Sequence, residues 1–318
     1  MKLFMKLWVQ YGRLLLAGIL LTALTGCRQN TTAQKHIIIG VSYQNLQDEY
    51  IIYLQRAIRS EAKKLHVGLI ELDAQGNAVN QISHVQDFVA RGVNAIILNP
   101  ADEQGSAPAV ALAVQDHIPI VVVNTLVSNV KEANAYVGSP DIEAGRMEAT
   151  EIIKRLHGRG NIAVIQGPYG SSAELQRTKG IRQVIAKFPG AKIVVEQTAN
   201  WSRVQALALM ENWLSAGRRI NAVIAENDDM ALGAEEAIQA AGKGKQIIVI
   251  GVDGIPDALR AVAEGKLAAT VSQNAHAQGT LAVKLAVRLA EGHKVRHTNY
   301  IPFRLVTARN VKEFLSSK

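Results

Sequence analysis

The sequence predicts an α/β protein built on two parallel sheets of roughly five or six strands each. The chain has 318 residues, which is more than one ordinary hydrophobic core accommodates. Hydrophobic residues make up 48% and aromatic residues 5%, so Ala, Val, Ile and Leu carry the core, as suits buried parallel strands. Short apolar runs alternate with stretches of helical periodicity, about ten such pairs in all, and one sheet rarely holds that many strands.

The first 27 residues have the composition of an export signal. Lys2, Lys6 and Arg13 precede an apolar run over 14–24, which is shorter than the about 20 residues that cross a bilayer. The segment ends in Leu-Thr-Gly-Cys27, which resembles a bacterial lipobox, whose cysteine is lipidated and becomes the new N-terminus. We therefore expect a signal peptide over 1–27 with a lipidated Cys27, then a polar tether over 28–36. An uncleaved membrane anchor with an incidental cysteine is the alternative.

The buried strands are predicted from short apolar runs. In chain order these runs cover residues 36–42, 68–73, 95–98, 118–123, 161–165, 222–225 and 247–250. Between them, Ile51, Leu54 and Ile58 recur at helical spacing, as do Ile152 and Leu156. Such alternation implies right-handed crossovers between parallel strands. A first β–α repeat is expected to end near 139–140, and a second to start with a helix from residue 141.

Polar side chains follow the ends of the predicted strands, where open α/β sheets bind their ligands. They are amides, a hydroxyl and a carboxylate, which exchange hydrogen bonds without performing chemistry. The set is Ser42, Asn45, Asn99, Asn124, Gln166, Asn227 and Asp253. One such residue alone is more often a helix cap or a turn former, but its recurrence in both halves favours a shared cleft for a polyhydroxylated ligand.

Two segments carry this pattern most clearly. In residues 226–234 a strand passes into a helix, and we expect Asn227 to point to the cleft while Asp228 or Asp229 caps the helix. In residues 251–257 Gly254 permits a tight turn, and Asp253 is left to face the ligand. A buried carboxylate without a protein partner is costly, and ligand hydroxyls relieve that cost.

At these residues the chain resembles the periplasmic sugar-binding proteins of the ribose, galactose and inositol type, the substrate-binding components of ABC importers. The resemblance spans about residues 37–310 and rests on four motifs. They are Leu98-Asn-Pro-Ala-Asp102, Asn227-Asp-Asp-Met-Ala-Leu-Gly233, Val252-Asp-Gly-Ile-Pro-Asp257 and Lys266-Leu-Ala-Ala-Thr-Val-Ser-Gln273.

The resemblance implies the type I periplasmic binding protein fold, two Rossmann-like lobes with parallel sheets joined by three hinge strands. It places the hinges near 138–140, 272–274 and 300–302. The N-terminal lobe is then expected to comprise 37–138 with 274–300, and the C-terminal lobe 139–273 with 301–318.

A candidate pocket also follows from the resemblance. Asn99 matches an amide after the third strand, Arg177 an arginine that binds ring hydroxyls, and Trp201 an aromatic side chain against the sugar ring. Asn227, Asp253 and Gln273 match the remaining polar contacts, and core packing is the alternative for Trp201.

Two departures from the ribose pattern bear on ligand identity. Asn124-Thr125 stands where that pattern has an Asp-Arg pair, and the loop after the first strand is slightly longer and acidic. Within that loop Tyr43 and Tyr50 are candidates for the aromatic surface, and Asp48 or Glu49 for contact with a hydroxyl or an amine. A hexose, a cyclitol such as inositol or an amino derivative all stay open.

The predicted function is therefore a non-enzymatic receptor that binds a sugar or cyclitol and delivers it to the permease subunits of an ABC importer. A receptor for a chemotaxis or kinase sensor is one alternative, and a secreted sugar-processing enzyme is another. We expect exported protein in the periplasm or cell envelope, tethered to the membrane through Cys27. The charge of +8 is dispersed along the chain, which gives little support to a nucleic-acid partner. The single cysteine and scattered histidines also lead us to expect no metal and no cofactor.

Overall fold

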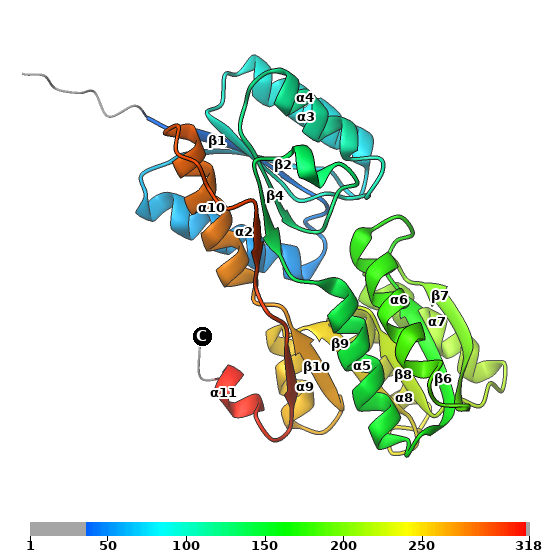
Figure 1. The fold of residues 1–318 in the computed structure, drawn as a ribbon. Helices are drawn as coiled ribbons and strands as arrows, with labels where there is room; N and C mark the ends of the chain where they lie inside the picture. The colour runs from blue at the N-terminus through cyan, green and yellow to red at the C-terminus, as the bar shows by residue number, and fades with distance from the viewer. Residues whose placement is uncertain (1–35, 316–318) are drawn as a thin grey trace, which may run out of the picture. The chain divides into compact units, whose positions relative to one another are not determined.

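The computed structural model describes residues 36–315, which form two six-stranded sheets (Figure 1). Cys27 and the predicted signal peptide lie outside these residues. The first sheet has the order β11-β5-β4-β3-β1-β2, and each neighbouring pair is parallel. Its strands are β1 (Ile38–Tyr43), β2 (Gly68–Asp73), β3 (Ala95–Leu98), β4 (Ile120–Asn124), β5 (Ala135–Gly138) and β11 (Thr298–Tyr300). The prediction of two parallel sheets is confirmed.

The second sheet has the order β12-β10-β9-β8-β6-β7. Its pairs are parallel except β10 with β12, which run antiparallel. The strands are β6 (Arg159–Gln166), β7 (Gly190–Thr198), β8 (Ala222–Ala225), β9 (Ile248–Asp253), β10 (Ala269–Ser272) and β12 (Arg304–Thr307). Both sheets thus have the doubly wound order that leaves polar strand ends along one edge.

Helices cover both faces of each sheet. In the first sheet, α2 (Glu49–Lys64) and α10 (Ala275–Ala290) pack side by side on one face, and α3 (Ala78–Ala90) and α4 (Ala107–Gln115) cover the other (Figure 1). In the second sheet, α5 (Asp141–Arg155) and α6 (Ser172–Ile185) pack on one face. The opposite face carries α7 (Arg203–Ser215), α8 (Asp228–Ala240), α9 (Pro256–Ala263) and α11 (Val311–Leu315). A short 3₁₀ helix, η1 (Val130–Glu132), follows β4. We refer to each sheet with its helices as the first and the second lobe.

The chain passes between the two sheets three times: between β5 and α5, between β10 and α10, and between β11 and β12. One group of side chains connects these crossings. The Gln278 side chain donates to the Ser139 hydroxyl (3.1 Å) and to the Gln273 carbonyl (3.1 Å). Ser139 in turn donates to the Ile301 carbonyl (2.7 Å). The three crossings are therefore tied together by hydrogen bonds, of which the two from Gln278 are buried.

Proline residues determine where one strand and one helix begin. β4 begins at Ile120 and not at 118, because Pro119 has no N–H to donate to a neighbouring strand. Pro256 stands in the first turn of α9, where its missing N–H costs no helix hydrogen bond.

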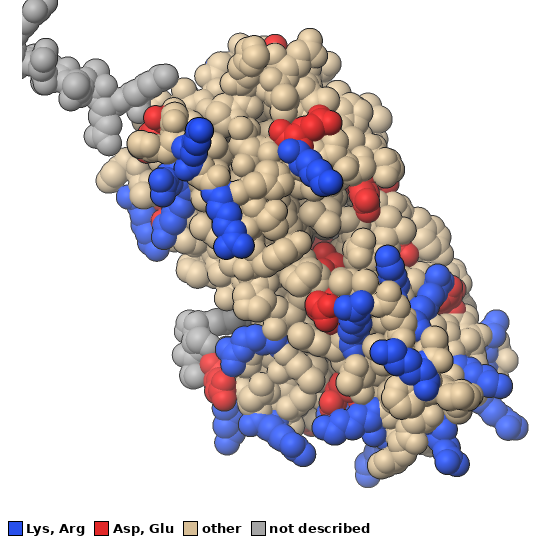
Figure 2. All heavy atoms as spheres, viewed as in Figure 1, with Lys and Arg blue, Asp and Glu red and all other residues tan. Residues whose placement is uncertain are grey.

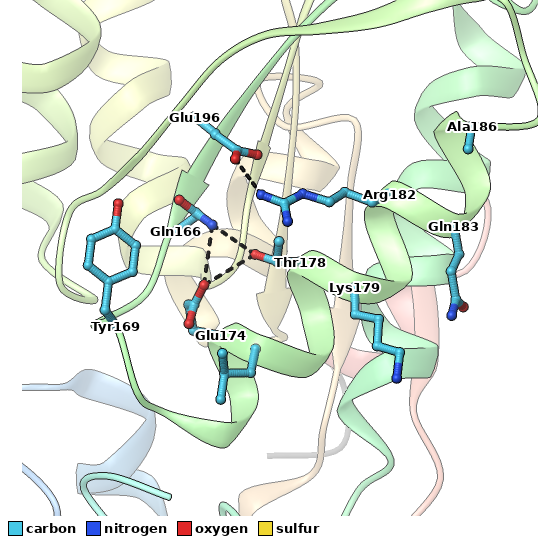
Figure 3. A pocket seen from close by; sticks show the side chains of 10 residues that line it. Gln166, Tyr169, Glu174, Thr178, Lys179, Arg182, Gln183, Ala186 and Glu196 are labelled. Atoms are coloured by element: carbon cyan, nitrogen blue, oxygen red, sulfur yellow. Dashed lines mark hydrogen bonds and ion pairs between the residues drawn. The ribbon is translucent and has the colours of Figure 1, made fainter.

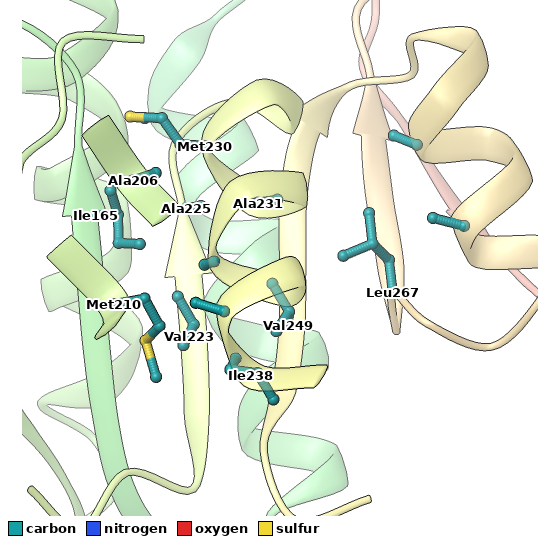
Figure 4. Packing of buried hydrophobic residues seen from close by; sticks show 14 of the residues in the cluster. Ile165, Ala206, Met210, Val223, Ala225, Met230, Ala231, Ile238, Val249 and Leu267 are labelled. Carbon is teal, nitrogen blue, oxygen red and sulfur yellow. The ribbon is translucent and has the colours of Figure 1, made fainter. Parts of the chain in front are cut away.

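The core of the second lobe is made of small and branched side chains, as the composition predicted. Figure 4 shows Met210 and Met230 filling the space between helices and sheet, with Val223 and Val249 on the strands beneath them. All four are buried. Because Met is unbranched and adaptable, it fills the irregular gaps that β-branched residues leave.

Charged side chains are spread over the surface. Figure 2 shows Lys and Arg dispersed over one face, with Asp and Glu between them. Within residues 36–315, no helix has the length and apolar character needed to cross a membrane.

Candidate functional site

Several predicted residues lie at strand ends in an unusual backbone conformation. Asn124 ends β4 with a φ of 66°, and Asp253 ends β9 with a φ of 132°. Trp201, in the loop between β7 and α7, has a φ of 60°. Positive φ is sterically disfavoured for residues other than glycine, and such strain concentrates at functional sites. Tertiary contacts therefore hold the backbone of these three residues in this conformation.

A chain of buried hydrogen bonds connects the strand ends of the two sheets. The Asn124 amide donates to Gln273 Oε1 (3.1 Å) and to Gln278 Oε1 (3.3 Å). Gln273, at the second crossing, donates from Nε2 to Asp253 Oδ1. Asn124, Gln273 and Asp253 are each at most 6% exposed. The structure thus brings these three predicted residues together.

Arg177 on α6 is the cation of this region. Its side chain is 3% exposed and pairs with Asp141, with Nη2 and Nε at 2.8 and 2.9 Å from Oδ1. Its Nη1 donates to the Glu226 carbonyl. Burial alone would lower the pKa of Arg177, but the Asp141 and Asp253 carboxylates raise it above its ordinary value. The guanidinium is consequently charged and fixed in direction.

Trp201 lies against Arg177, whose Cζ is 5.6 Å from the ring centroid. The indole also lies directly over the backbone of Gly167, where a Cβ would stand 2.1 Å from the ring. Only glycine therefore allows this position of the indole. Trp201 is half-buried and packs on the core of the second lobe, which makes it part core and part site wall.

The first lobe contributes the start of α2. Asp48 caps this helix, accepting from the Tyr50 backbone N–H (2.9 Å) and from Gln44 Nε2 (3.4 Å). Tyr50 is 4% exposed, and its hydroxyl has no hydrogen-bond partner. Burial raises the pKa of Tyr50 well above its ordinary value, and the nearby Asp253 carboxylate adds to the rise. The Asp253 carboxylate that contributes to this rise belongs to the other lobe.

Asn99 makes its side-chain hydrogen bonds within the first lobe. Asn99 accepts from the Gln44 N–H (3.1 Å) and donates to Thr125 Oγ1 (3.2 Å) and the Val123 carbonyl (3.4 Å). All of these partners belong to its own lobe. Its amide therefore positions the strand-end loops of the first lobe.

Asn227 has the helix-cap role that the sequence assigned to Asp228 or Asp229. It is the N-cap of α8, accepting from the Met230 N–H (2.9 Å), and it donates to the Trp201 carbonyl (3.3 Å). The expectation that Asp228 or Asp229 caps the helix was wrong. Asp228 instead accepts from the N–H groups of Gly254 (2.7 Å) and Ile255 (3.0 Å).

Tyr43 does not provide the aromatic surface that the sequence suggested for it. It is fully buried in the first lobe, and its hydroxyl donates to Glu71 Oε1 (2.8 Å). Asn45 is half-buried and lines a cavity of about 690 Å³ together with Asp48 and Trp201. That cavity lies between the N-terminal ends of α2 and α7, so both lobes contribute to its wall.

A second cavity of about 660 Å³ lies between α6 and β7 and contains none of the residues that the resemblance assigns to the pocket (Figure 3). Gln166, one of the polar strand-end residues, points into it and donates to Glu174 (3.2 Å) and Thr178 (3.0 Å). An Arg182–Glu196 ion pair closes one side. The strand-end pattern alone does not distinguish this cavity from the site between the lobes.

Sequence reasoning missed Asp141 and Glu226, which hold Arg177 in place. Asp141 opens α5 directly after the first crossing, and a carboxylate at a helix start reads from sequence as a favourable helix-dipole residue. Its pairing with α6 is a tertiary contact without a sequence signal. In the part of the chain that the structure describes, no three His, Cys, Asp or Glu side chains gather as metal ligands would.

Comparison with known proteins gives the family. Residues 39–294 match the family described as "Periplasmic binding protein domain". A protein of Rhizobium meliloti described as rhizopine-binding is 40% identical over 89% of this chain and 94% of the relative. The ribose import binding protein of Bacillus subtilis is 35% identical over 88% of this chain and 90% of the relative.

Solved structures agree with this placement. An ABC transporter solute-binding protein of Bacillus halodurans with bound myo-inositol is 41% identical, with a TM-score of 0.86, covering 89% of this chain and 98% of that one. The Caulobacter myo-inositol-binding protein is 32% identical, with a TM-score of 0.85, covering 90% and 98%. The predicted two-lobe fold and the prediction of a binding protein, not an enzyme, are confirmed. The chain belongs to the periplasmic binding protein family.

Proposed function

We propose that this protein is the substrate-binding component of an ABC importer, capturing a monosaccharide or a cyclitol of the inositol type between its lobes and delivering it to the permease. The relatives support this class, since the Bacillus subtilis relative is a ribose import binding protein and two similar solved structures hold myo-inositol. We propose binding lobes of 37–138 with 274–300 and 139–273 with 301–318, where residues 316–318 lie outside the described part of the chain.

One observation carries the proposal: buried polar groups of both lobes converge on one place. Asn124 of the first lobe donates to Gln273 at the second crossing, and Gln273 donates to Asp253 of the second lobe. All three are at most 6% exposed. Neutral, negative and positive hydrogen-bonding groups around an aromatic wall suit a molecule with many hydroxyls, since each hydroxyl both donates and accepts.

Contacts between the lobes away from the crossings indicate how the site closes. The Glu103 N–H donates to the Gly170 carbonyl (2.8 Å), and the Leu126 N–H to the Ser172 hydroxyl (2.7 Å). A ligand that touches both lobes favours this arrangement over a separated one by its differential affinity. Ligand capture then corresponds to the closed arrangement of the lobes, and ligand release to the separated one.

Calorimetric titration tests the proposal with myo-inositol, D-ribose and D-galactose. We expect at least one to bind, and Asp253→Ala to weaken that binding by about 1.5–3 kcal/mol, the scale for a hydrogen bond to a charged group. Asp116→Asn is the matched control, because Asp116 is exposed after α4. Binding unaffected by Asp253→Ala would remove Asp253 from the site, and no binding of any sugar or cyclitol would refute the ligand class.

The membrane tether is a separate proposal, based on the Leu-Thr-Gly-Cys27 ending of the apolar leader. Acylation of Cys27 holds the protein at the membrane, since each buried CH₂ contributes about 0.8 kcal/mol. Cys27→Ser should yield unprocessed protein that does not label with radioactive palmitate, while the parent chain labels. Equal labelling of the two would exclude Cys27 as the acylated residue.

A further inference from the structure

The lobes also meet away from the three crossings, at the start of α6. The first lobe contributes the loop after β3, which contains Glu103, and the loop after β4, which contains Leu126. The second lobe contributes residues 170–172, where a turn leads into α6. The Glu103 N–H donates to the Gly170 carbonyl (2.8 Å), and the Leu126 N–H donates to the Ser172 hydroxyl (2.7 Å). Two backbone amides of one lobe thus bind one turn of the other.

The two donor loops are held within the first lobe. The Ser128 N–H donates to the Glu103 carbonyl (2.8 Å), which ties one loop to the other. Thr125 Oγ1 donates to the Pro100 carbonyl (2.7 Å), and the Asn99 amide donates to Thr125 Oγ1 (3.2 Å). Contacts within the first lobe therefore fix the direction of both amides, and the second lobe supplies only their acceptors.

Gly170 allows the lobes to approach each other closely at this place. Its φ is 93°, a region that favours glycine. A Cβ at this position would stand 2.0 Å from Asp102 Oδ2 of the first lobe. The Asp102 side chain is itself held, because its Oδ1 accepts from the Gln104 N–H (2.9 Å). A side chain at position 170 would therefore keep the two lobes apart.

Two neighbouring serines separate this contact from ordinary burial. Ser171 and Ser172 are 2% and 1% exposed. The Ser172 hydroxyl accepts a hydrogen bond from the first lobe, whereas the Ser171 hydroxyl has no partner among the described residues. Arg177 follows Ser172 by five residues on α6, so a contact that holds the start of this helix also helps to hold the guanidinium.

We propose that Gly170 and Ser172 are positioning residues for closure, which bind the first lobe when the lobes meet and do not touch the ligand. Neither residue lines the cavity between the N-terminal ends of α2 and α7. The proposal rests on the proposed function and adds the contacts that hold its closed arrangement. Such contacts shift the equilibrium between separated and closed lobes, so they strengthen the binding of every ligand by the same factor. They also slow release, because they must break before the lobes part.

Ser172→Ala tests the proposal, with Ser171→Ala as the matched control. Both are titrated with each of myo-inositol, D-ribose and D-galactose that the parent binds. We expect Ser172→Ala to raise every dissociation constant by about fivefold or more, the factor for leaving the Leu126 N–H without its acceptor in the closed arrangement. Most of that factor should appear in the dissociation rate. Ser171→Ala should stay within about twofold of the parent, since its hydroxyl has no bond to lose.

Amide hydrogen exchange, measured by NMR, gives a readout that a merely structural role would not change. In the parent, saturating ligand should slow the exchange of the Glu103 and Leu126 amides, because both are bonded across the lobes in the closed arrangement. In Ser172→Ala the ligand should protect the Glu103 amide alone, because the acceptor of that amide is the Gly170 backbone carbonyl.

The outcomes separate this proposal from the proposed function. If Ser172→Ala binds as tightly as the parent, or if ligand protects neither amide in the parent, the closure role is wrong and the receptor function stands. A Ser172→Ala variant that loses affinity for one ligand and keeps it for another would place Ser172 in contact with the ligand, which also overturns the proposal. If the parent binds none of the three compounds, the proposed function fails and the closure role fails with it.

Discussion

At the scale of the residue, the same side-chain type serves two different purposes. Asn124 ends β4 and Asn99 follows β3, both in the first sheet, and the sequence predicts a ligand contact for each. Asn124 reaches Gln273 at the second crossing, whereas the Asn99 amide is used entirely by its own lobe. Strand position is readable from sequence, but side-chain direction depends on loops that fold back from elsewhere. That is also why Asp141, the partner of Arg177, had no sequence signal.

Asn99→Ala distinguishes the structural role from a direct ligand contact. Removing this amide leaves the Gln44 N–H without its acceptor in a buried loop. We expect the free energy of unfolding to fall by about 1–3 kcal/mol, the cost of an unsatisfied buried group. Chemical denaturation measures it, with Asp116→Asn as the control because Asp116 is exposed after α4. A loss of ligand affinity without a loss of stability would instead assign Asn99 to the ligand.

At the scale of the element, the sequence predicted most of the interior strands of the two sheets but missed most of the edge strands. The apolar runs correspond to β1, β2, β3, β4, β6, β8 and β9. The other strands are not among those runs. β7 shows the reason: it is an edge strand whose exposed positions include Lys192 and Glu196, so its apolar residues are interrupted. β11 and β12 are three and four residues long, and their pairing partners are far away in the sequence.

The packing of α5 on α6 is an element-scale feature with consequences for the site. A Cβ on Gly145 of α5 would stand 2.1 Å from the Arg177 carbonyl oxygen, so the two helices approach each other through backbone. Asp141 on α5 bonds Arg177 on α6 across the same contact. The glycine therefore sets the distance at which this ion pair forms.

Gly145→Ala should consequently weaken both stability and ligand binding. Alanine in a helix interior ordinarily stabilises by roughly 0.5–1 kcal/mol relative to glycine. Here we expect overpacking to reverse the sign, with a loss of about 1–3 kcal/mol in the free energy of unfolding and a displaced Arg177. Thr150→Ala, on an exposed position of the same helix, is the matched control. A Gly145→Ala variant as stable as the parent would show that the helices do not need this close approach.

At the scale of the whole molecule, two sheets with polar strand ends face a common site and are linked by three crossings. The general plan was readable from alternating periodicity, because parallel strands must end together at one edge. The hydrogen bond from Gln278 to Ser139, which joins two of the crossings, was not, because it connects positions 139 residues apart. The account's central claim is that both lobes bind one hydroxyl-rich ligand at the same time.

A crystal structure of the protein grown with whichever sugar, cyclitol or amino derivative binds most tightly tests that claim most directly. The account predicts ligand density within hydrogen-bond distance of Tyr50 from the first lobe and of Arg177 or Asp253 from the second. Density confined to one lobe, such as in the cavity between α6 and β7, would contradict it.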